Sequence, residues 1–165
     1  MLPFRLLYTL SDFVYLIVYY VVGYRKETVR KNIALALPHL SDAERLVIEK
    51  KSFQHLCDMF LEMIKTMNIS EKEIKKRFVL TNVEVLKKLE EQNKSIALML
   101  AHYASYEWVI SMNYYSSHRS TAIYKKIANP YFDKLVRDIR SRFKSSLVTT
   151  KESVPTIIRN KNNNI

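Results

Sequence analysis

The spacing of apolar residues divides the chain into an apolar N-terminal segment and a longer region of alternating elements. Residues 4–24 are almost continuously apolar and aromatic, interrupted by Ser11 and Asp12. The sequence Ser-Asp-Ala-Glu at 41–44 has the form of a capping box, and apolar residues recur after it at helical spacing over about six turns. A second capping-box sequence, Ser-Glu-Lys-Glu at 70–73, predicts a short helix.

Short apolar runs farther along the chain predict β-strands at 77–82, 95–101, 120–126 and 146–150. The run at 95–101 is continuously apolar, which is typical of a strand covered on both faces. Helices are predicted around these runs at 83–93, 106–115 and 130–144. Because helices alternate with strands, the sequence predicts an α/β fold in which membrane-associated N-terminal helices precede a mainly parallel sheet with crossover helices.

The N-terminal apolar segment is followed at once by basic residues, namely Arg25, Lys26, Arg30 and Lys31. At about 20 residues the segment is barely long enough to cross a bilayer, and its tyrosines suit the headgroup zone. No small-residue site typical of a cleaved signal peptide follows it. We therefore expect residues 1–24 to form an uncleaved helix that anchors to, or dips into, the membrane. The alternative is a buried N-terminal helix of a soluble protein.

Composition narrows the chemistry that this chain can perform. With a single Gly among 165 residues, a glycine-rich phosphate loop is excluded. Cys57 is the only cysteine, so no internal disulfide can form. The four histidines are widely spaced and lack cysteine partners, so the sequence predicts neither a metal site nor a cofactor.

The net charge of +11 is concentrated toward the C-terminal part of the chain, since residues 101–165 hold eleven Lys and Arg against four Asp and Glu. A region of this kind attracts polyanions such as nucleic acid, an anionic membrane, phosphorylated lipid or an acidic protein. The basic residues are not interleaved with aromatic residues as a stacking platform for nucleic acid requires. We therefore expect no nucleic-acid partner, although a basic nucleic-acid-binding module remains the competing hypothesis.

The stretch "LMLAHYASYEWVI" at 98–110 sets two titratable residues, His102 and Glu107, among apolar ones. His102 lies at the carboxyl end of the strand predicted at 95–101, where open α/β sheets bind ligands. In a strand-to-helix turn, a carboxylate can hold one imidazole nitrogen so that the other nitrogen serves as a base. These residues are therefore a candidate catalytic pair. The alternative is a core histidine followed by a helix-start glutamate.

Four ordered blocks of the chain resemble a known family. The His-x4-Glu spacing resembles the His-x4-acid motif of glycerolipid-type acyltransferases. In order, the four blocks resemble signature segments of the lipid A biosynthesis acyltransferases, which are the bacterial inner-membrane lauroyl and myristoyl transferases. The blocks lie at 24–45, 60–65, 101–108 and 124–143. Ala104 and Ser105 stand where that family usually has Gly-Asn, and Lys125 stands where it has Arg.

This resemblance implies O-acyl transfer from an acyl thioester to a hydroxyl of a membrane glycolipid such as a lipid A precursor. The implied donor is acyl carrier protein or another acyl-thioester carrier. His102 would take the proton from the acceptor hydroxyl, and Glu107 would orient the imidazole. The implied location is the bacterial inner membrane, with the active site on the cytoplasmic side.

Four further residues are candidates for substrate binding by the same resemblance. Arg140 and Arg142 align with basic positions that would bind lipid phosphate or steady the oxyanion, or they could form a solvated basic helix face. Lys125 and Asn129 are the other two candidates, and both could instead shape the loop that holds them.

The resembled family extends beyond Ile165. We therefore expect residues 25–165 to be the N-terminal part of a single acyltransferase domain, truncated at its C-terminus. A catalytically inactive membrane-bound fragment is the alternative.

Overall fold

The computed structural model describes residues 2–118, 120–143 and 145–160. The chain forms two compact units, Met1–Glu62 and Met63–Ile165.

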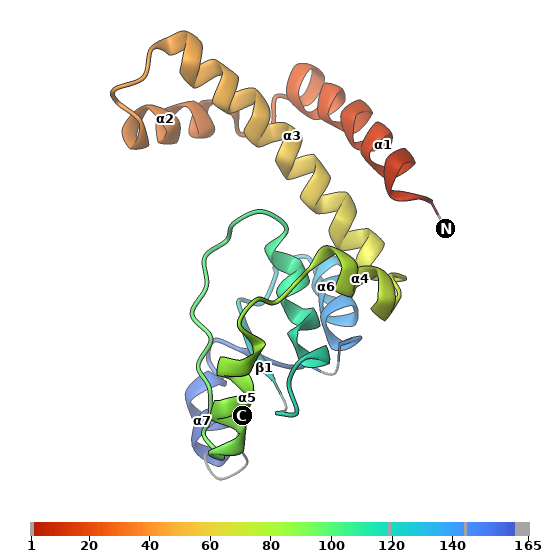
Figure 1. Cartoon of the computed structure of the whole chain (residues 1–165). Coiled ribbons are helices and arrows are strands. Elements are labelled where there is room, and N and C mark those ends of the chain that lie inside the picture. The colour runs from red at the N-terminus through yellow and green to blue at the C-terminus, as the bar shows by residue number, and fades with distance from the viewer. Residues whose placement is uncertain (1, 119, 144, 161–165) are drawn as a thin grey trace. The chain divides into compact units, whose positions relative to one another are not determined.

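The first unit is helical and begins with the apolar segment. It contains α1 (Phe4–Leu16), the π-helix η1 (Ile17–Val22), α2 (Lys26–Ala36) and most of α3 (Asp42–Thr66). α1 continues directly into η1, and this continuous helix ends at Gly23, whose φ of +63° suits a residue without a side chain. α1 runs alongside α3 (Figure 1).

The helix from Phe4 to Val22 is long and apolar enough to cross a membrane. It has 19 residues, a mean hydropathy of 1.4 and only 17% of its most apolar window buried. The N-terminal apolar helix predicted from the sequence is therefore confirmed.

A buried carboxylate, Glu49 on α3, holds the first unit together. Its side chain accepts hydrogen bonds from the Tyr19 hydroxyl at 2.8 Å and from Arg30 Nε at 2.7 Å, and the residue is 2% exposed. Burial opposes the ionisation of Glu49, but these two hydrogen bonds outweigh it and keep its pKa below the ordinary value. Glu49 therefore connects η1, α2 and α3 through one ionised group.

The capping box at 41–44 begins α3 as predicted. The Ser41 amide donates to a Glu44 carboxylate oxygen at 2.8 Å, and the Glu44 amide donates to the Ser41 hydroxyl at 3.3 Å. At the second capping-box sequence, 70–73, the Ser70 hydroxyl accepts from the Glu73 amide at 3.2 Å and caps the next helix.

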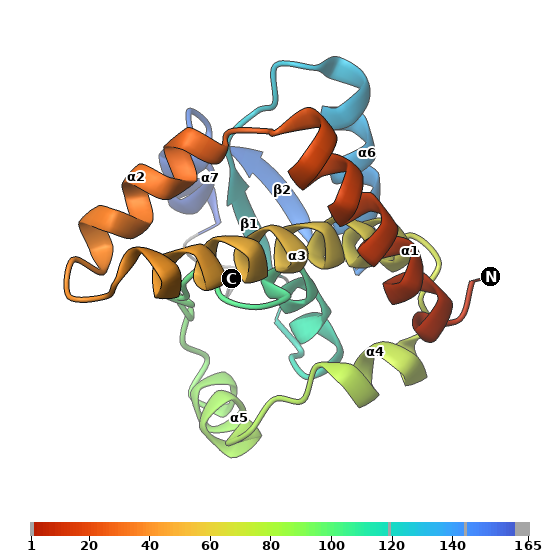
Figure 2. The ribbon, with the colours of Figure 1, turned by 90° about the horizontal axis from the view of Figure 1, so that it is seen from above.

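The second unit contains short helices around a small sheet. Its elements are α4 (Glu71–Arg77), α5 (Val83–Glu91), the 3-10 helix η2 (Tyr106–Tyr114), β1 (Thr121–Tyr124), α6 (Pro130–Ser141), β2 (Ser146–Thr149) and α7 (Ser153–Arg159). β1 and β2 lie side by side in parallel (Figure 2), with Thr121 opposite Ser146 and Tyr124 opposite Thr149. Since α6 connects these two parallel strands, the predicted α/β fold with a crossover helix is confirmed.

Two predicted strands are wrong. Residues 77–82 form the end of α4 and an irregular connection, because helical ion pairs of Lys75 with Glu71 and of Arg77 with Glu73 favour helix up to Arg77. Residues 95–101 form an exposed irregular segment. A strand buried on both faces needs neighbouring strands, and within the described ranges the sheet consists of β1 and β2 alone.

The core of the second unit forms where α6 meets the end of α3. Met63, Val136 and Ile139 are buried together, with Phe132 and Leu135 packed against them. The apolar face of α6 therefore fixes the position of this helix, which carries the predicted site residues Asn129 and Arg140 at its two ends.

We expect acid to weaken the first unit through Glu49. Because the folded pKa of Glu49 is lowered, its ionised form contributes stability above the ordinary glutamate pKa, and this contribution is lost as the pH falls through the folded value. Glu49→Gln should lower the free energy of unfolding at neutral pH by about 1–3 kcal/mol and flatten this acid dependence. Chemical denaturation over a pH series measures both effects.

The matched control for this prediction is Glu27→Gln. Glu27 pairs with Lys31 on the surface, and its side chain is 83% exposed, so little change is expected. An unchanged acid dependence in Glu49→Gln would contradict the role given to this carboxylate.

Candidate active site

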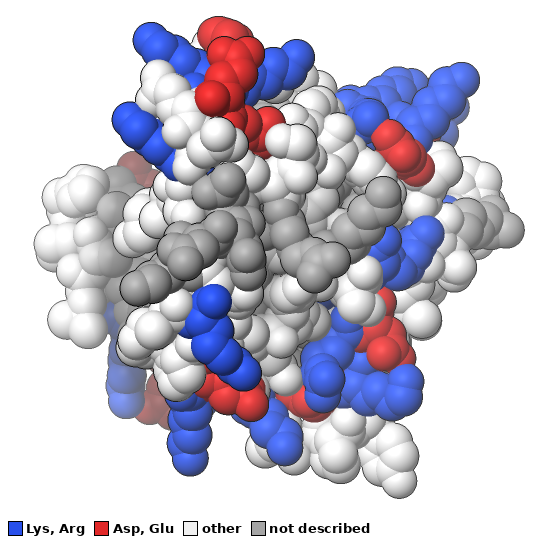
Figure 3. All heavy atoms as spheres, turned by 90° about the horizontal axis from the view of Figure 1, so that it is seen from below, with Lys and Arg blue, Asp and Glu red and all other residues white. Residues whose placement is uncertain are grey.

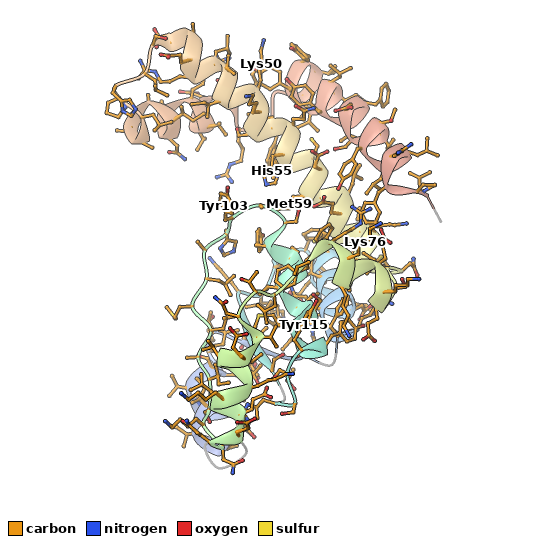
Figure 4. All side chains as sticks on the ribbon, in the orientation of Figure 1. Lys50, His55, Met59, Lys76, Tyr103 and Tyr115 are labelled. Atoms are coloured by element: carbon orange, nitrogen blue, oxygen red, sulfur yellow. The ribbon has the colours of Figure 1, made fainter. Side chains whose placement is uncertain are left out.

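A long exposed segment leads into η2 and carries His102. Residues 94–105 contain no helix or strand, and Met99 and Tyr103 are 90% and 84% exposed. Tyr103 lies at the bend of this segment in Figure 4. Ala104 has a left-handed φ of +48°, which costs an alanine about 1 kcal/mol relative to glycine. His102 therefore stands on an exposed turn rather than at the end of a buried strand.

Glu107 and Arg140 form an ion pair between η2 and α6. Arg140 donates through Nη2 to Glu107 Oε1 at 2.6 Å and through Nε to Oε2 at 3.1 Å. The Glu107 side chain is 9% exposed and that of Arg140 is 20% exposed. Two parallel N–H···O bonds of this kind fix both direction and distance. Arg140 therefore belongs to a buried pair and does not lie on a solvated helix face.

Tyr106 links His102 to this ion pair. The imidazole ring of His102 lies 4.3 Å from the Tyr106 ring, centroid to centroid, at an interplanar angle of 56°. Burial raises the pKa of Tyr106, and the charge of Glu107 raises it further while Arg140 lowers it. His102, Tyr106, Glu107 and Arg140 thus form one group of neighbouring side chains, which we call the Glu107–Arg140 cluster.

Within the part of the chain that the structure describes, no hydrogen bond joins His102 to Glu107. Both oxygens of Glu107 accept from Arg140, and His102 contacts the aromatic ring next to it. The structure thus brings three of the predicted site residues into one region. The catalytic pairing of His102 with Glu107 stays a prediction.

Arg142 bonds to the backbone at the end of α3. It donates to the carbonyl oxygen of Thr66 and, through Nη2 at 3.3 Å, to that of Ile69. The Thr66 carbonyl is among those that a helix end leaves without intrahelical partners, and Ile69 lies in the connection that follows α3. Arg142 therefore stabilises the end of α3, and its predicted contact with substrate stays untested.

Asn129 caps the N-terminus of α6. Its side-chain oxygen accepts from the amides of Tyr131 at 3.0 Å and Phe132 at 3.1 Å. The buried Asp133 accepts from the Ile127 amide at 2.9 Å and closes the preceding loop onto the helix. Asn129 and Arg140 lie at opposite ends of α6, about 16 Å apart along its axis at 1.5 Å per residue.

Lys125 directly follows β1 and is exposed. It lies on the same loop as Asn129, away from the end of α6 that holds Arg140. The structure therefore places Lys125 and Asn129 apart from the Glu107–Arg140 cluster, and Arg142 binds the backbone at the end of α3.

Sequence reasoning missed two polar residues that position η2. Asn113 donates to the Phe143 carbonyl at 2.5 Å and to the Ser145 hydroxyl at 2.7 Å, which ties η2 to the segment before β2. Tyr115, labelled in Figure 4, donates to the Phe78 carbonyl at 3.1 Å and ties the end of η2 to α4. Neither has a sequence signal, because an isolated Asn or Tyr has no spacing that marks it.

An open depression of about 480 Å³ lies between α6 and β2, and Lys134, Arg137, Ser141 and Ser145 are among its lining residues. None of the predicted site residues, all of which are described, lines it. No group of three or more His, Cys, Asp or Glu side chains suited to a metal ion occurs among the residues placed in the structure.

The comparison with protein families identifies the class of this protein. The family model of the bacterial lipid A biosynthesis acyltransferases matches residues 1–165, the whole chain. The chain therefore belongs to this family, and acyltransferase chemistry follows in general terms. No curated protein sequence matches the chain significantly.

We expect the Glu107–Arg140 pair to be strongly coupled in stability. Glu107→Gln and Arg140→Met should each lower the free energy of unfolding by about 3 kcal/mol, because each leaves its partner partly buried without a counter-charge. The double variant should lose at least 1 kcal/mol less than the sum of the single losses. Chemical denaturation of the four proteins in this cycle measures the coupling.

Lys134→Met is the matched control, since it removes a cation from the same helix. The Lys134–Asp138 pair is exposed on both sides, at 77% and 57%, so its loss should cost less than about 1 kcal/mol. Additive single losses at Glu107 and Arg140 would rule out the coupling.

Two substitutions distinguish the capping role of Asn129 from a contact with substrate. Asn129→Ala should lower the free energy of unfolding by about 1 kcal/mol, because it removes the cap of α6. Asn129→Asp keeps a capping oxygen and should retain both stability and acyl transfer. A stable Asn129→Asp protein with strongly reduced transfer would instead favour a direct contact with substrate.

Proposed function

We propose that this protein transfers a fatty acyl chain from an acyl thioester, carried on acyl carrier protein, to a hydroxyl group of a membrane glycolipid such as a lipid A precursor. The observation that carries this proposal is the family match over residues 1–165. The Glu107–Arg140 cluster supports it, because it gathers a base, a carboxylate and a guanidinium in one region.

In the proposed reaction, His102 acts as the general base. Its imidazole takes the proton of the acceptor hydroxyl while the oxygen attacks the thioester carbonyl. The tetrahedral intermediate then collapses, the carbon–sulfur bond breaks, and the imidazolium returns the proton to the leaving thiolate. The products are an ester and a free thiol, and no covalent enzyme intermediate is required.

Glu107 supports His102 in this proposal while it stays bound to Arg140. A carboxylate has about four lone-pair positions, and Arg140 occupies two of them. An imidazole N–H can therefore bond to the same carboxylate once the exposed turn at 101–105 moves toward η2. Ala104, within this turn, stands where the family usually has glycine, so the left-handed conformation there is retained at a cost in stability.

The exposed cations are proposed to bind the acceptor's phosphate groups. Lys125 is exposed on the loop after β1. Arg142 is also exposed, and a phosphate would be bound by the guanidinium N–H groups that do not donate to Thr66 and Ile69. On the face drawn in Figure 3, Lys and Arg side chains stand in separate groups, most with acidic side chains beside them. Acidic neighbours offset part of this positive charge, so the proposal depends on Lys125 and Arg142 rather than on an extended basic patch.

The proposed location is the cytoplasmic side of a bacterial inner membrane. The apolar helix Phe4–Val22 and the basic residues directly after it support this placement. The acyl-thioester donor is a cytoplasmic species in this proposal, and the acceptor lies in the bilayer.

The proposed base is tested by His102→Ala. Acyl transfer from a thioester donor to a glycolipid acceptor in detergent micelles should fall by about 10²–10⁴-fold per folded molecule. Because His102 is exposed, the substitution should change the free energy of unfolding by less than about 0.5 kcal/mol. Circular dichroism and denaturation of the same samples establish the folded fraction.

The matched control is His39→Ala, which removes another exposed histidine and should leave transfer unchanged. Near-normal turnover of folded His102→Ala would exclude His102 as the base.

A further inference from the structure

The helix α1–η1 has an apolar face that nothing in the first unit covers. Residues at 6, 10, 13, 17 and 20 follow the helical spacing of one face, and their side chains are exposed. Leu6 is 54% exposed, Phe13 is 59% exposed and Tyr20 is 60% exposed. We call this the outer face of α1–η1. Large apolar side chains in one continuous row indicate contact with an apolar partner.

The opposite face of the same helix is turned toward α3, and Leu7, Ser11 and Tyr19 on it are buried. Hydrogen bonds join the two helices from the Tyr8 hydroxyl to Glu62 at 2.7 Å, from Gln54 to Asp12 at 2.9 Å and from the Tyr19 hydroxyl to Glu49 at 2.8 Å. The helix is thus held to α3 by packing and hydrogen bonds on one face, while large apolar side chains stay exposed on the other.

These bonds decide how the helix can meet a bilayer. α3 runs alongside α1 (Figure 1) and carries charged residues along its length, including Arg45, Lys50 and Asp58. A helix that spans the bilayer while bonded to α3 would draw those charges into the hydrocarbon, where charged side chains are expensive. The length of Phe4–Val22 alone would permit a span, but its bonds to α3 oppose one.

The flanking residues suit an anionic lipid surface. Arg30 and Lys31 of α2 pair with Glu49 and Glu27, yet their side chains are 56% and 71% exposed. Arg25, directly before α2, is exposed as well, and Lys26 lies over the Tyr19 ring at 3.8 Å. Basic residues beside an apolar helix face are typical of a helix that lies in the interface and contacts anionic headgroups.

We propose that α1–η1 lies in the plane of one leaflet of an anionic membrane, with its outer face in the acyl-chain boundary, and does not cross the bilayer. This inference deepens the membrane anchoring of the proposed function and rests on it. The bonds between α1–η1 and α3 stay intact in the bound state, and α3 stays on the aqueous side.

Depth measurements distinguish the two arrangements. Single-cysteine variants Leu6→Cys, Phe13→Cys and Tyr20→Cys, made in a Cys57→Ser background, carry an environment-sensitive fluorophore and are bound to phosphatidylglycerol-containing vesicles. Nitroxide lipids labelled at different depths then locate each fluorophore. Leu6 and Tyr20 are 14 residues apart, so a spanning helix separates them by about 21 Å along the membrane normal.

The expected result is one shallow depth for all three labels, each quenched from the leaflet to which the protein binds. A deeper label at Phe13, with the labels at Leu6 and Tyr20 in opposite leaflets, would overturn the proposal. Leu10→Cys and Ile17→Cys repeat the comparison on the same face if one of the first variants does not fold. A control label at Ala43→Cys, exposed on the first turn of α3, should remain open to aqueous iodide, and its protection would also overturn the proposal.

Acyl transfer in detergent micelles separates this inference from the function on which it rests. Folded protein that transfers acyl chains in micelles but does not bind vesicles would overturn the membrane arrangement alone. Protein that binds in the plane but does not transfer would leave the arrangement standing and contradict the proposed function.

Discussion

The ion pair between Glu107 and Arg140 is the interaction on which the candidate site depends. It joins a 3-10 helix to α6 through two hydrogen bonds, with both side chains mostly withdrawn from water. If Arg140 were lost, Glu107 would be a buried carboxylate without a counter-charge, which destabilises the fold. The turn that carries His102 leads directly into the helix that holds Glu107, so the pair fixes the end of that turn.

Buried carboxylates organise both units of the chain. Glu49 connects η1, α2 and α3 in the first unit, as Glu107 connects η2 and α6 in the second. Chains with few apolar contacts between short elements need such directional bonds to fix one arrangement. The consequence is different in each unit: Glu49 binds Tyr19 of the N-terminal helix to α3, whereas Glu107 holds the guanidinium of Arg140 in the region of the proposed base.

The elements that sequence reasoning predicted well are those with local causes. The capping box at 41–44, the N-terminal apolar helix and the strands near 121 and 146 follow from side-chain patterns of adjacent residues. The strand expected at 95–101 failed because its apolar run specifies burial only if neighbouring strands exist. Arg140 was found as a candidate, but its partner was not, because the two residues are 33 positions apart and pair only after α6 folds. The spacing of His102 and Glu107 marked both as candidates, but it could not show that both carboxylate oxygens of Glu107 bond to Arg140.

The central claim is that one carboxylate, Glu107, serves Arg140 and His102 together during transfer. Nitrogen NMR of ¹⁵N-histidine-labelled protein tests this directly, with the His102 signal assigned by its absence in His102→Ala. When a glycolipid acceptor and a non-reactive thioester analogue are added, the account predicts that the His102 imidazole shifts to a single tautomer with one N–H held in a hydrogen bond. A His102 signal that keeps the tautomer exchange of an exposed histidine such as His39, with both ligands bound, would contradict it.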